Sequence, residues 1–269
     1  MTDIEAVQIR RSKDGRPYIK QDIGKEVLYS RVSTFAKALS DGAGLAAWKM
    51  RMAYLGLQDR PDLMGFTDRQ GIDAALAAAM DHAGANDAAD LGTALHALAD
   101  VFDFSEGGLS RDAWDLAPHV WDAMDRYVEV TKGLTMLAGE QFVVIDAMKV
   151  AGSFDRLIAL PDGRIVIGDL KTGTLRMQEH AIQLACYARG LRYDVETGAR
   201  SLIHENIDTS VGVVIHVPRD PSIGETRLVG VDLEAGWEMA LLAQRVRATR
   251  SRKVEISITR EEEAIHDND

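Results

Sequence analysis

Two apolar segments of the chain end in side chains that could do chemistry together. Asp155 closes Gly152-Ser-Phe-Asp, and further along the chain Asp169 precedes Lys171 in Asp-Leu-Lys. The turn Pro161-Asp-Gly between them predicts a hairpin with a three-residue loop whose glycine is left-handed. Asp155 then lies opposite Asp169 with Cβ atoms roughly 5 Å apart, and Lys171 points to the same face. The spacing therefore predicts two carboxylates and one ammonium at one end of a hairpin.

Two carboxylates this close repel each other, and proteins usually relieve the repulsion with a hard divalent cation bound through oxygen. Such a site suits phosphodiester hydrolysis, because the metal polarises the phosphate and lowers the pKa of a bound water. Lys171 would orient or deprotonate that water and offset charge in the transition state. The alternative is a surface Asp–Lys pair worth less than about 1 kcal/mol. We favour the metal site, because Asp169 follows the apolar run 165–167.

A histidine upstream adds a possible nitrogen ligand. Gly92, His96 and Asp100 are four residues apart and share one face of a predicted helix. Gly92 would admit a close neighbour, and Asp100 would orient the imidazole. A lone histidine on an apolar helix usually packs in the core, and only the downstream acids favour a ligand here. Mixed imidazole and carboxylate ligation suits Mn²⁺ as well as Mg²⁺, with a slight preference for Mn²⁺.

In these motifs the chain resembles the PD-(D/E)XK nuclease superfamily, specifically its RecB-like exonuclease branch. The family places an Asp at the end of one strand and (Asp/Glu)-x-Lys on the next, as at Asp155 and 169–171. The branch also has Gly-x-x-x-His on an upstream helix and Gln-x-x-x-Tyr on a later one. These motifs match residues 92–96 and 183–187, so the resemblance spans about 91–192.

The resemblance implies roles for further groups. The main-chain carbonyl of Leu170 would join His96 and the two aspartates as a metal ligand. Glu140 stands where relatives often carry an acid, although a Glu at a strand start is ordinarily solvated. Gln183 and Tyr187 share a helical face and would contact a phosphate or stack on a base. Their ordinary interpretation is a core tyrosine with a surface glutamine.

The composition limits the cofactors and the partners. The chain has 269 residues and a net charge of −11, with Cys186 as its only cysteine. One thiol excludes an internal disulfide, a four-thiolate zinc site and a cysteine-ligated iron–sulfur cluster, so the resemblance is to cluster-free phage-type members. We expect Cys186 to be an apolar filler. No apolar stretch is long enough to span a membrane, so we expect a soluble protein in the cytoplasm, that of the host if a phage encodes it.

The acidity is regional, which leaves room for a DNA partner. Residues 1–60 carry 11 basic and 7 acidic side chains, a net of +4, whereas residues 61–139 carry 4 and 14, a net of −10. We expect DNA to approach the basic segments at either end of the chain. The tentative contacts are Arg31, Ser33 and Thr34, where a helix begins, and Arg247 and Arg250, near the end of the last helix. The alternative for the first three is an ordinary helix cap, and for the last two it is a favourable interaction with the helix dipole. Trp48 is a further candidate beside Lys49, although we expect it in the core.

The order of elements predicts a mixed α/β fold. Helices dominate to about residue 132, strands follow at 141–145, 150–160 and 164–170, then a helix at 178–192, strands at 211–217 and 226–231, and a helix at 233–252. We predict one domain over 1–269, with a helical N-terminal part (about 26–135), a nuclease core (about 136–255) and an acidic tail (261–269). The resemblance implies a restriction-endonuclease-like core, a central mixed sheet flanked by helices.

The leading hypothesis is a metal-dependent exonuclease acting on the ends of linear single- or double-stranded DNA in recombination, repair or replication. Catalysis would use Asp155, Asp169 and Lys171. A recombination or single-strand-binding protein is a possible partner, and the oligomeric state is open. Two alternatives remain. One is a non-catalytic nucleic-acid-binding or assembly subunit on a nuclease fold, and the other is a structure-selective or RNA-directed endonuclease.

Overall fold

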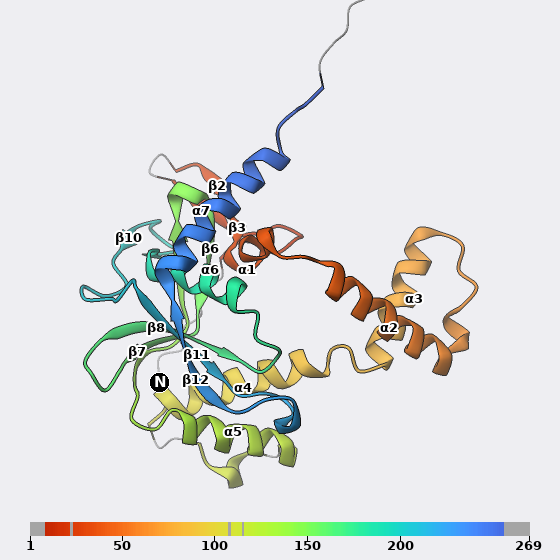
Figure 1. The fold of residues 1–269 in the computed structure, drawn as a ribbon, viewed down its shortest axis with the longest axis horizontal. Coiled ribbons are helices and arrows are strands. Elements are labelled where there is room, and N and C mark those ends of the chain that lie inside the picture. Colours follow the sequence, from red (N-terminus) through yellow and green to blue (C-terminus); the bar gives the residue numbers. More distant parts are fainter. Residues whose placement is uncertain (1–8, 22–23, 107–108, 115, 256–269) are drawn as a thin grey trace, which may run out of the picture.

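The computed structural model describes residues 9–21, 24–106, 109–114 and 116–255. The predicted acidic tail, 261–269, lies outside the described residues. The α/β class is confirmed, and the architecture is consistent with a restriction-endonuclease-like core (Figure 1). In the described part of the chain, no helix is long and apolar enough to cross a membrane.

The strands form two mixed five-stranded sheets instead of one central sheet. The first has the order β10, β9, β5, β6, β3 and consists of β3 (Ser30–Arg31), β5 (Gln141–Ile145), β6 (Val150–Phe154), β9 (Leu191–Tyr193) and β10 (Arg200–Ser201). The second has the order β12, β11, β8, β7, β4 and consists of β4 (Thr135–Ala138), β7 (Arg156–Ala159), β8 (Ile165–Lys171), β11 (Val211–His216) and β12 (Arg227–Asp232). A separate hairpin joins β1 (Tyr18–Lys20) and β2 (Glu26–Leu28), so the N-terminal part predicted as helical from 26 begins with strands.

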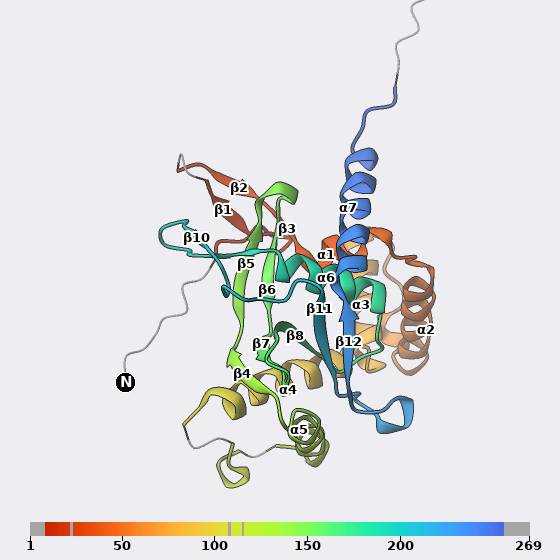
Figure 2. The same ribbon diagram turned by 60° about the vertical axis from the view of Figure 1, so that its left-hand side comes forward.

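Asp155 lies where the chain passes from one sheet to the other. The single strand predicted over 150–160 is two strands, β6 and β7, separated only by Asp155. β6 pairs with β5 in the first sheet, whereas β7 pairs with β8 and β4 in the second. Figure 2 shows β5 and β6 side by side, with β7 and β8 continuing beyond the end of β6. The break places an acid at the junction of the two sheets.

The hairpin register predicted from the Pro161-Asp-Gly163 loop is confirmed. The Leu160 N–H donates to the Arg164 carbonyl at 2.9 Å, and Gly163 has a φ of +87°. Arg156 consequently pairs with Gly168 on β8. β11 runs parallel to β8 on its other side and covers it from that edge. β8 is therefore a central strand, and a side chain near its end is shielded by strands on both sides.

Helices cover both sides of the second sheet. The α-helices in the described part of the chain are α1 (Val32–Ala36), α2 (Ala43–Asp59), α3 (Arg69–His82), α4 (Asp87–Phe104), α5 (Pro118–Val130), α6 (Met177–Ala188) and α7 (Leu233–Arg250). One apolar core joins α1, α6 and α7 to the strands, and a second joins α4 and α5 to them. On α5 the buried residues Val120, Ala123, Met124 and Tyr127 follow helical spacing, so one face of the helix packs inward.

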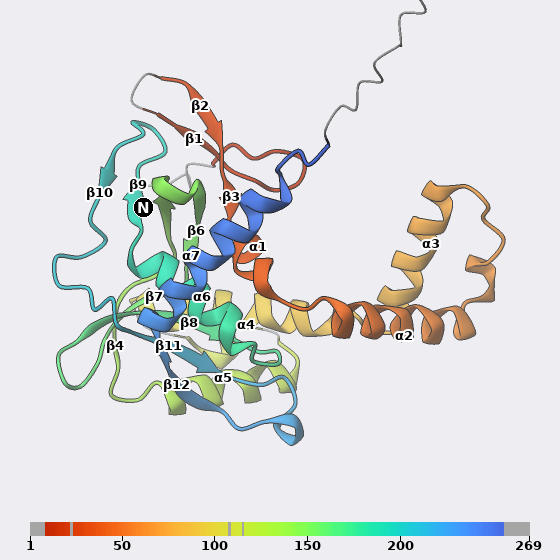
Figure 3. The same cartoon turned by 45° about the horizontal axis from the view of Figure 1, so that its top comes forward.

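Two details of these helices differ from the sequence prediction. The helix expected over 178–192 ends at Ala188, because Gly190 follows and the chain then enters β9. A Cβ at Gly190 would lie 3.1 Å from the Val143 side chain, so Val143 would have to shift to admit a larger residue there. Trp48, expected in the core, is 37% exposed on α2. The α2–α3 pair projects away from the two-sheet body, as Figure 3 shows, so its outer side chains have no core to enter.

Candidate active site

The end of β8 and the junction of the sheets bring the predicted acids and lysine together. Asp169, the antepenultimate residue of β8, is only 1% exposed, and its carboxylate forms an ion pair with the Lys171 ammonium. Asp155 Oδ2 accepts a hydrogen bond from the Leu170 N–H at 2.8 Å. Lys171 lies two residues beyond Asp169 and on the same face of the strand, as the period of two requires. The three charged groups therefore meet at one place.

Burial makes the charges of this cluster costly. Burial, and next the charge of Asp169, raise the pKa of Asp155 well above its usual value. Burial alone would lower the pKa of Lys171, but the charges of Asp169 and Asp155 outweigh it and raise that pKa. Lys171 is therefore an ammonium at neutral pH. Asp155 would be relieved by an additional positive charge nearby.

His96 projects from α4 toward the same point. Its Nε2 lies 3.1 Å from the main-chain oxygen of Leu170, and its Nδ1 lies 3.6 Å from Asp155 Oδ2. Burial, and next the charge of Lys171, lower the pKa of His96, so the imidazole is neutral at neutral pH. A neutral imidazole is the form that binds metals. One turn earlier, a Cβ at Gly92 would lie 3.0 Å from Thr172 Oγ1, so the glycine admits a close neighbour as predicted.

Asp100 does not orient His96, contrary to the sequence prediction. Its carboxylate pairs with Arg156 Nη1 at 2.5 Å, because the fully buried Arg156 needs negative partners. Arg156 also pairs with Asp103 at 2.8 Å, and Asp103 accepts a hydrogen bond from the Tyr127 hydroxyl at 2.6 Å. Arg156 Nη1 further donates to the main-chain oxygen of Asp155 at 2.8 Å. This network ties α4, which carries His96, to the residue that precedes β7.

Sequence reasoning missed Arg156, although a signal for it was present. Arg156 directly follows Asp155 in a strand whose next residues, Leu157 and Ile158, are buried on either face. A charged side chain inside such a strand requires buried partners of opposite charge. Asp100 and Asp103 were available on the acidic helix that also carries His96. The spacing of Asp100 and Asp103 along the helix does not show that Arg156 is the cationic side chain with which they pair.

Glu140 lies at the entrance of the same site. It is exposed, directly precedes β5, and lines a cavity of about 440 Å³ together with His96, Leu170 and Lys171. The cavity is open to solvent beside the carboxylate cluster. The structure thus brings this predicted supporting acid to the site.

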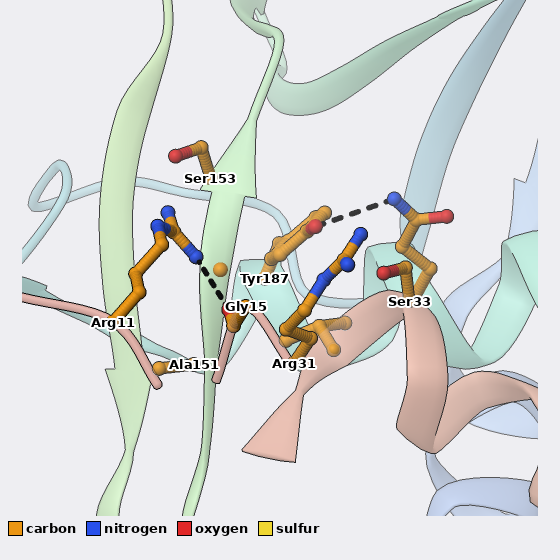
Figure 4. Close-up of a pocket in the computed structure, with 10 residues that line it drawn as sticks. Arg11, Gly15, Arg31, Ser33, Ala151, Ser153 and Tyr187 are labelled. Carbon is orange, nitrogen blue, oxygen red and sulfur yellow. Dashed lines mark hydrogen bonds between the residues drawn. The ribbon is translucent and has the colours of Figure 1, made fainter. Parts of the chain in front are cut away.

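Gln183 and Tyr187 lie on α6 beside a second cavity, also of about 440 Å³. The Gln183 amide donates to the Tyr187 hydroxyl at 3.2 Å. Only 3% of Tyr187 is exposed and its ring packs against Phe154, so the ring is not available to stack on a base. The hydroxyl still reaches the cavity. Arg31 and Ser33 line the same space (Figure 4).

The other tentative DNA contacts lie outside this cavity. α1 begins at Val32 and has no side-chain cap, so Ser33 and Thr34 stand inside the helix instead of capping it. Thr34 is exposed. Arg247 donates to the Ser30 hydroxyl at 2.5 Å and lies over the Phe35 ring, so part of its role is structural. Arg250 is exposed one turn later on α7.

The donor atoms at the first cavity fit a hard divalent cation. Two carboxylates, one carbonyl oxygen and a neutral imidazole lie close together, and burial, followed by the charge of Asp169, raises the pKa of Asp155. Among the described residues, no three His, Cys, Asp or Glu side chains are already placed to share one ion. The Lys171 ammonium pairs with the Asp169 carboxylate, and the Leu170 N–H donates to Asp155 Oδ2. A bound cation would compete for these carboxylate oxygens.

Comparison with known proteins adds an independent finding. The family model described as the PD-(D/E)XK nuclease superfamily matches residues 69–262. No curated protein matches the chain. The matched region contains His96 on α4, Asp155 between β6 and β7, and Asp169 and Lys171 on β8. The chain belongs to the PD-(D/E)XK nuclease superfamily, and this membership indicates a metal-dependent nuclease.

Proposed function

We propose that the protein is a divalent-metal-dependent exodeoxyribonuclease of the RecB-like, phage-type branch. It hydrolyses phosphodiester bonds at the ends of linear single- or double-stranded DNA in the cytoplasm, during recombination, repair or replication. The observation that carries the proposal is the approach of His96 on α4 to the Leu170 carbonyl and Asp155, beside the Asp169–Lys171 pair. These groups come from three separate parts of the chain, and His96, Leu170 and Lys171 line one open cavity.

His96, Asp155, Asp169 and the Leu170 carbonyl would hold Mn²⁺ or Mg²⁺. When bound, the cation supplies a Lewis acid that polarises the phosphate and lowers the pKa of water. Asp155 and Asp169 contribute the negative charge that attracts the cation. His96 contributes a neutral nitrogen, and Arg156 links Asp155 to α4 through its contacts with the Asp155 main-chain oxygen and with Asp100.

Lys171 acts as a charged donor. Because its pKa is raised by Asp169 and Asp155, it keeps its proton at neutral pH and can donate hydrogen bonds to the attacking water or to a phosphate oxygen. This favours orienting the water and offsetting the charge that develops on the phosphate over removing the proton of the water. Glu140, exposed at the cavity, is placed to accept a hydrogen bond from that water.

The DNA strand would enter past the two cavities. Arg31, Ser33, Gln183 and the Tyr187 hydroxyl line one of them, and we assign them to phosphate contact. Thr34, Arg247 and Arg250 lie on α1 and α7 and are assigned to outer contacts with duplex or single-stranded DNA. We further propose a recombination or single-strand-binding protein as a partner, because the enzyme would act at DNA ends.

The direct test uses end-labelled linear DNA with the purified protein in Mn²⁺, in Mg²⁺ and in EDTA. The proposal expects stepwise shortening of linear strands in either metal, none in EDTA, and intact closed-circular DNA. Cleavage of circular DNA or of RNA would instead favour the structure-selective or RNA-directed endonuclease. Intact linear DNA in both metals would favour a non-catalytic binding or assembly subunit.

A further inference from the structure

The two helices α2 and α3 with their connection, residues 43–82, form an arm that has almost no core of its own. All of these residues lie in the described part of the chain, and among them only Gly56, Ala75 and Ala79 are buried. A Cβ at Gly56 would collide with the Ala79 main-chain oxygen, so the helices cross in direct contact there. Figures 1 and 3 show the arm extending away from the two sheets. Short helices are marginal in water unless an apolar face packs against a partner, and three small residues bury little apolar surface.

Large apolar side chains gather on one side of the arm. On α2, Met50, Tyr54 and Leu57 are separated by four and three residues, so they share one face of the helix. Leu57 lines a notch between the helices together with Ile72 and Leu76 of α3. The exposed side chains of this surface are between 37% and 66% accessible. We name as the arm face the residues Met50, Tyr54, Met64, Phe66, Ile72 and Leu76.

The arm face is large enough for one side of a stable interface. Its six side chains present on the order of 500 Å² of apolar surface. A standard protein–protein interface buries about 800 Å² of each partner, of which about 60% is apolar. Two helices from each of two arms would together bury their apolar faces in the core of a four-helix bundle.

The arm face carries both a protruding group and a hollow that fits it. The notch has a volume of about 170 Å³ and apolar walls. An apolar cavity of about 150 Å³ holds a benzene ring, so the notch can receive one aromatic side chain. Tyr54 is 64% exposed one helical turn before Leu57, at the border of the notch. A two-fold interface requires one surface to be complementary to itself, and a ring beside a hollow of its size meets this requirement.

The charges of the arm are also complementary to each other. Residues 43–58 contain Lys49 and Arg51 and no acid, a net of +2, whereas residues 59–73, which include most of the notch, contain four acids and two arginines, a net of −2. A two-fold pairing brings the basic segment of each copy against the acidic segment of the other. A different protein with one sign of charge would match only one of the two segments. The charge pattern therefore favours a second copy of this chain as the partner.

We propose that two copies of the chain pair through their arm faces about a two-fold axis and form a four-helix bundle. Tyr54 of each copy is seated in the notch of the other. The pairing gives α2 and α3 the apolar cover that their own contacts do not supply. It does not depend on nuclease activity, so the two proposals stand or fall separately.

Sedimentation velocity of the full chain over a dilution series tests the pairing. The wild type should sediment with the mass of two chains and dissociate on dilution. Met50→Glu combined with Tyr54→Glu places charges in the centre of the interface and should raise the dissociation constant by at least about 100-fold. The matched control is Leu241→Glu combined with Leu242→Glu, at two exposed positions on α7, and it should pair as the wild type does.

A charge exchange tests the two-fold arrangement with substitutions at exposed positions only. One variant combines Lys49→Glu with Arg51→Glu, and the other combines Asp59→Lys with Asp73→Lys. Each variant alone sets like charges opposite each other and should sediment as a single chain. An equimolar mixture should form pairs again, because opposite charges then meet at both contacts. Circular dichroism of each variant verifies that the helices are retained.

Three results would overturn the pairing. They are a wild type that sediments as a single chain at every concentration, undiminished pairing of Met50→Glu with Tyr54→Glu, and a mixture of the two charge variants that does not associate. A wild type that stays single would assign the arm face to another protein. A chain that pairs as expected but leaves DNA intact would instead refute only the nuclease proposal.

Discussion

His96 Nε2 lies 3.1 Å from the main-chain oxygen of Leu170, although 74 residues separate the two in the chain. The contact joins the middle of α4 to the penultimate residue of β8. It is possible because the Gly92 backbone approaches Thr172 closely one helical turn earlier. The helix and the strand are therefore held at a distance that lets a nitrogen and an oxygen ligand face one cation.

This relationship makes His96 necessary for metal affinity. We expect His96→Ala to raise the Kd for Mn²⁺ by at least about tenfold, since even indirect supports of a metal ligand are worth 10- to 100-fold. Isothermal titration calorimetry with Mn²⁺ measures the change. His119→Ala, at an exposed position on α5, is the matched control and should bind as the wild type does. Equal affinities of the His96 variant and the control would remove the imidazole from the site.

Asp155 should destabilise the metal-free protein. Burial and the charge of Asp169 raise its pKa, so the ionised carboxylate weakens the folded state at neutral pH. Asp155→Asn should therefore raise the Tm in EDTA at pH 7, by about 2–4 °C for each kcal/mol of repulsion removed. The gain should shrink as the pH falls through the raised pKa, because the wild-type carboxyl then takes up a proton in the folded state.

Differential scanning calorimetry with and without Mn²⁺ checks this expectation. In saturating Mn²⁺ the order should reverse, because only the wild type gains the full binding energy of the cation. A variant less stable than the wild type in EDTA at pH 7 would show that Asp155 is already compensated without a metal.

Arg156 should be important for stability. Arg156→Met leaves Asp103 and the Tyr127 hydroxyl buried without their cation, which costs about 3–5 kcal/mol for a buried pair. Urea unfolding measures the loss. Arg164→Met breaks a surface pair with Asp162 and should change the free energy of unfolding by less than about 1 kcal/mol. Similar small losses in both variants would show that the network is solvated.

Cys186 should be inert in the folded protein. It is fully buried in the core of α6, α7 and the sheets, as predicted for an apolar filler, and burial raises its pKa to about 12. Thiolate is therefore scarce at pH 8, and a thiol reagent should label the chain only in denaturant. Rapid labelling of native protein, followed by mass spectrometry, would contradict this placement.

The local part of the site was readable from the sequence. The Pro161-Asp-Gly163 loop determines the β7–β8 register, and the period of two places Lys171 beside Asp169. The absence of a side chain at Gly92 likewise predicted a close neighbour. Each of these inferences depends on residues within one hairpin or one helical turn, where backbone geometry leaves few alternatives.

Long-range pairing was not readable. Asp100 of α4 stands at i+4 from His96, yet it pairs with Arg156, which is 56 residues further along the chain. The passage of the chain from β6 into a second sheet at Asp155, and the presence of Arg11 beside the cavity at Gln183 and Tyr187, also depend on packing between distant segments. Sequence periodicity reports which face of an element is buried, but it does not report which distant partner covers that face.

The proposed active site is tested most directly by the cleavage rate of Lys171→Ala on prebound linear DNA in Mn²⁺. Single-turnover measurement is chosen so that DNA affinity, followed separately by anisotropy, does not enter the rate. We expect a cleavage rate lower by about 10²–10³-fold with DNA affinity largely unchanged, because the variant lacks one hydrogen-bond donor to the charge that develops on the phosphate. Lys132→Ala, at an exposed position just after α5, should cut as the wild type does. Wild-type cleavage by Lys171→Ala would contradict the proposed active site.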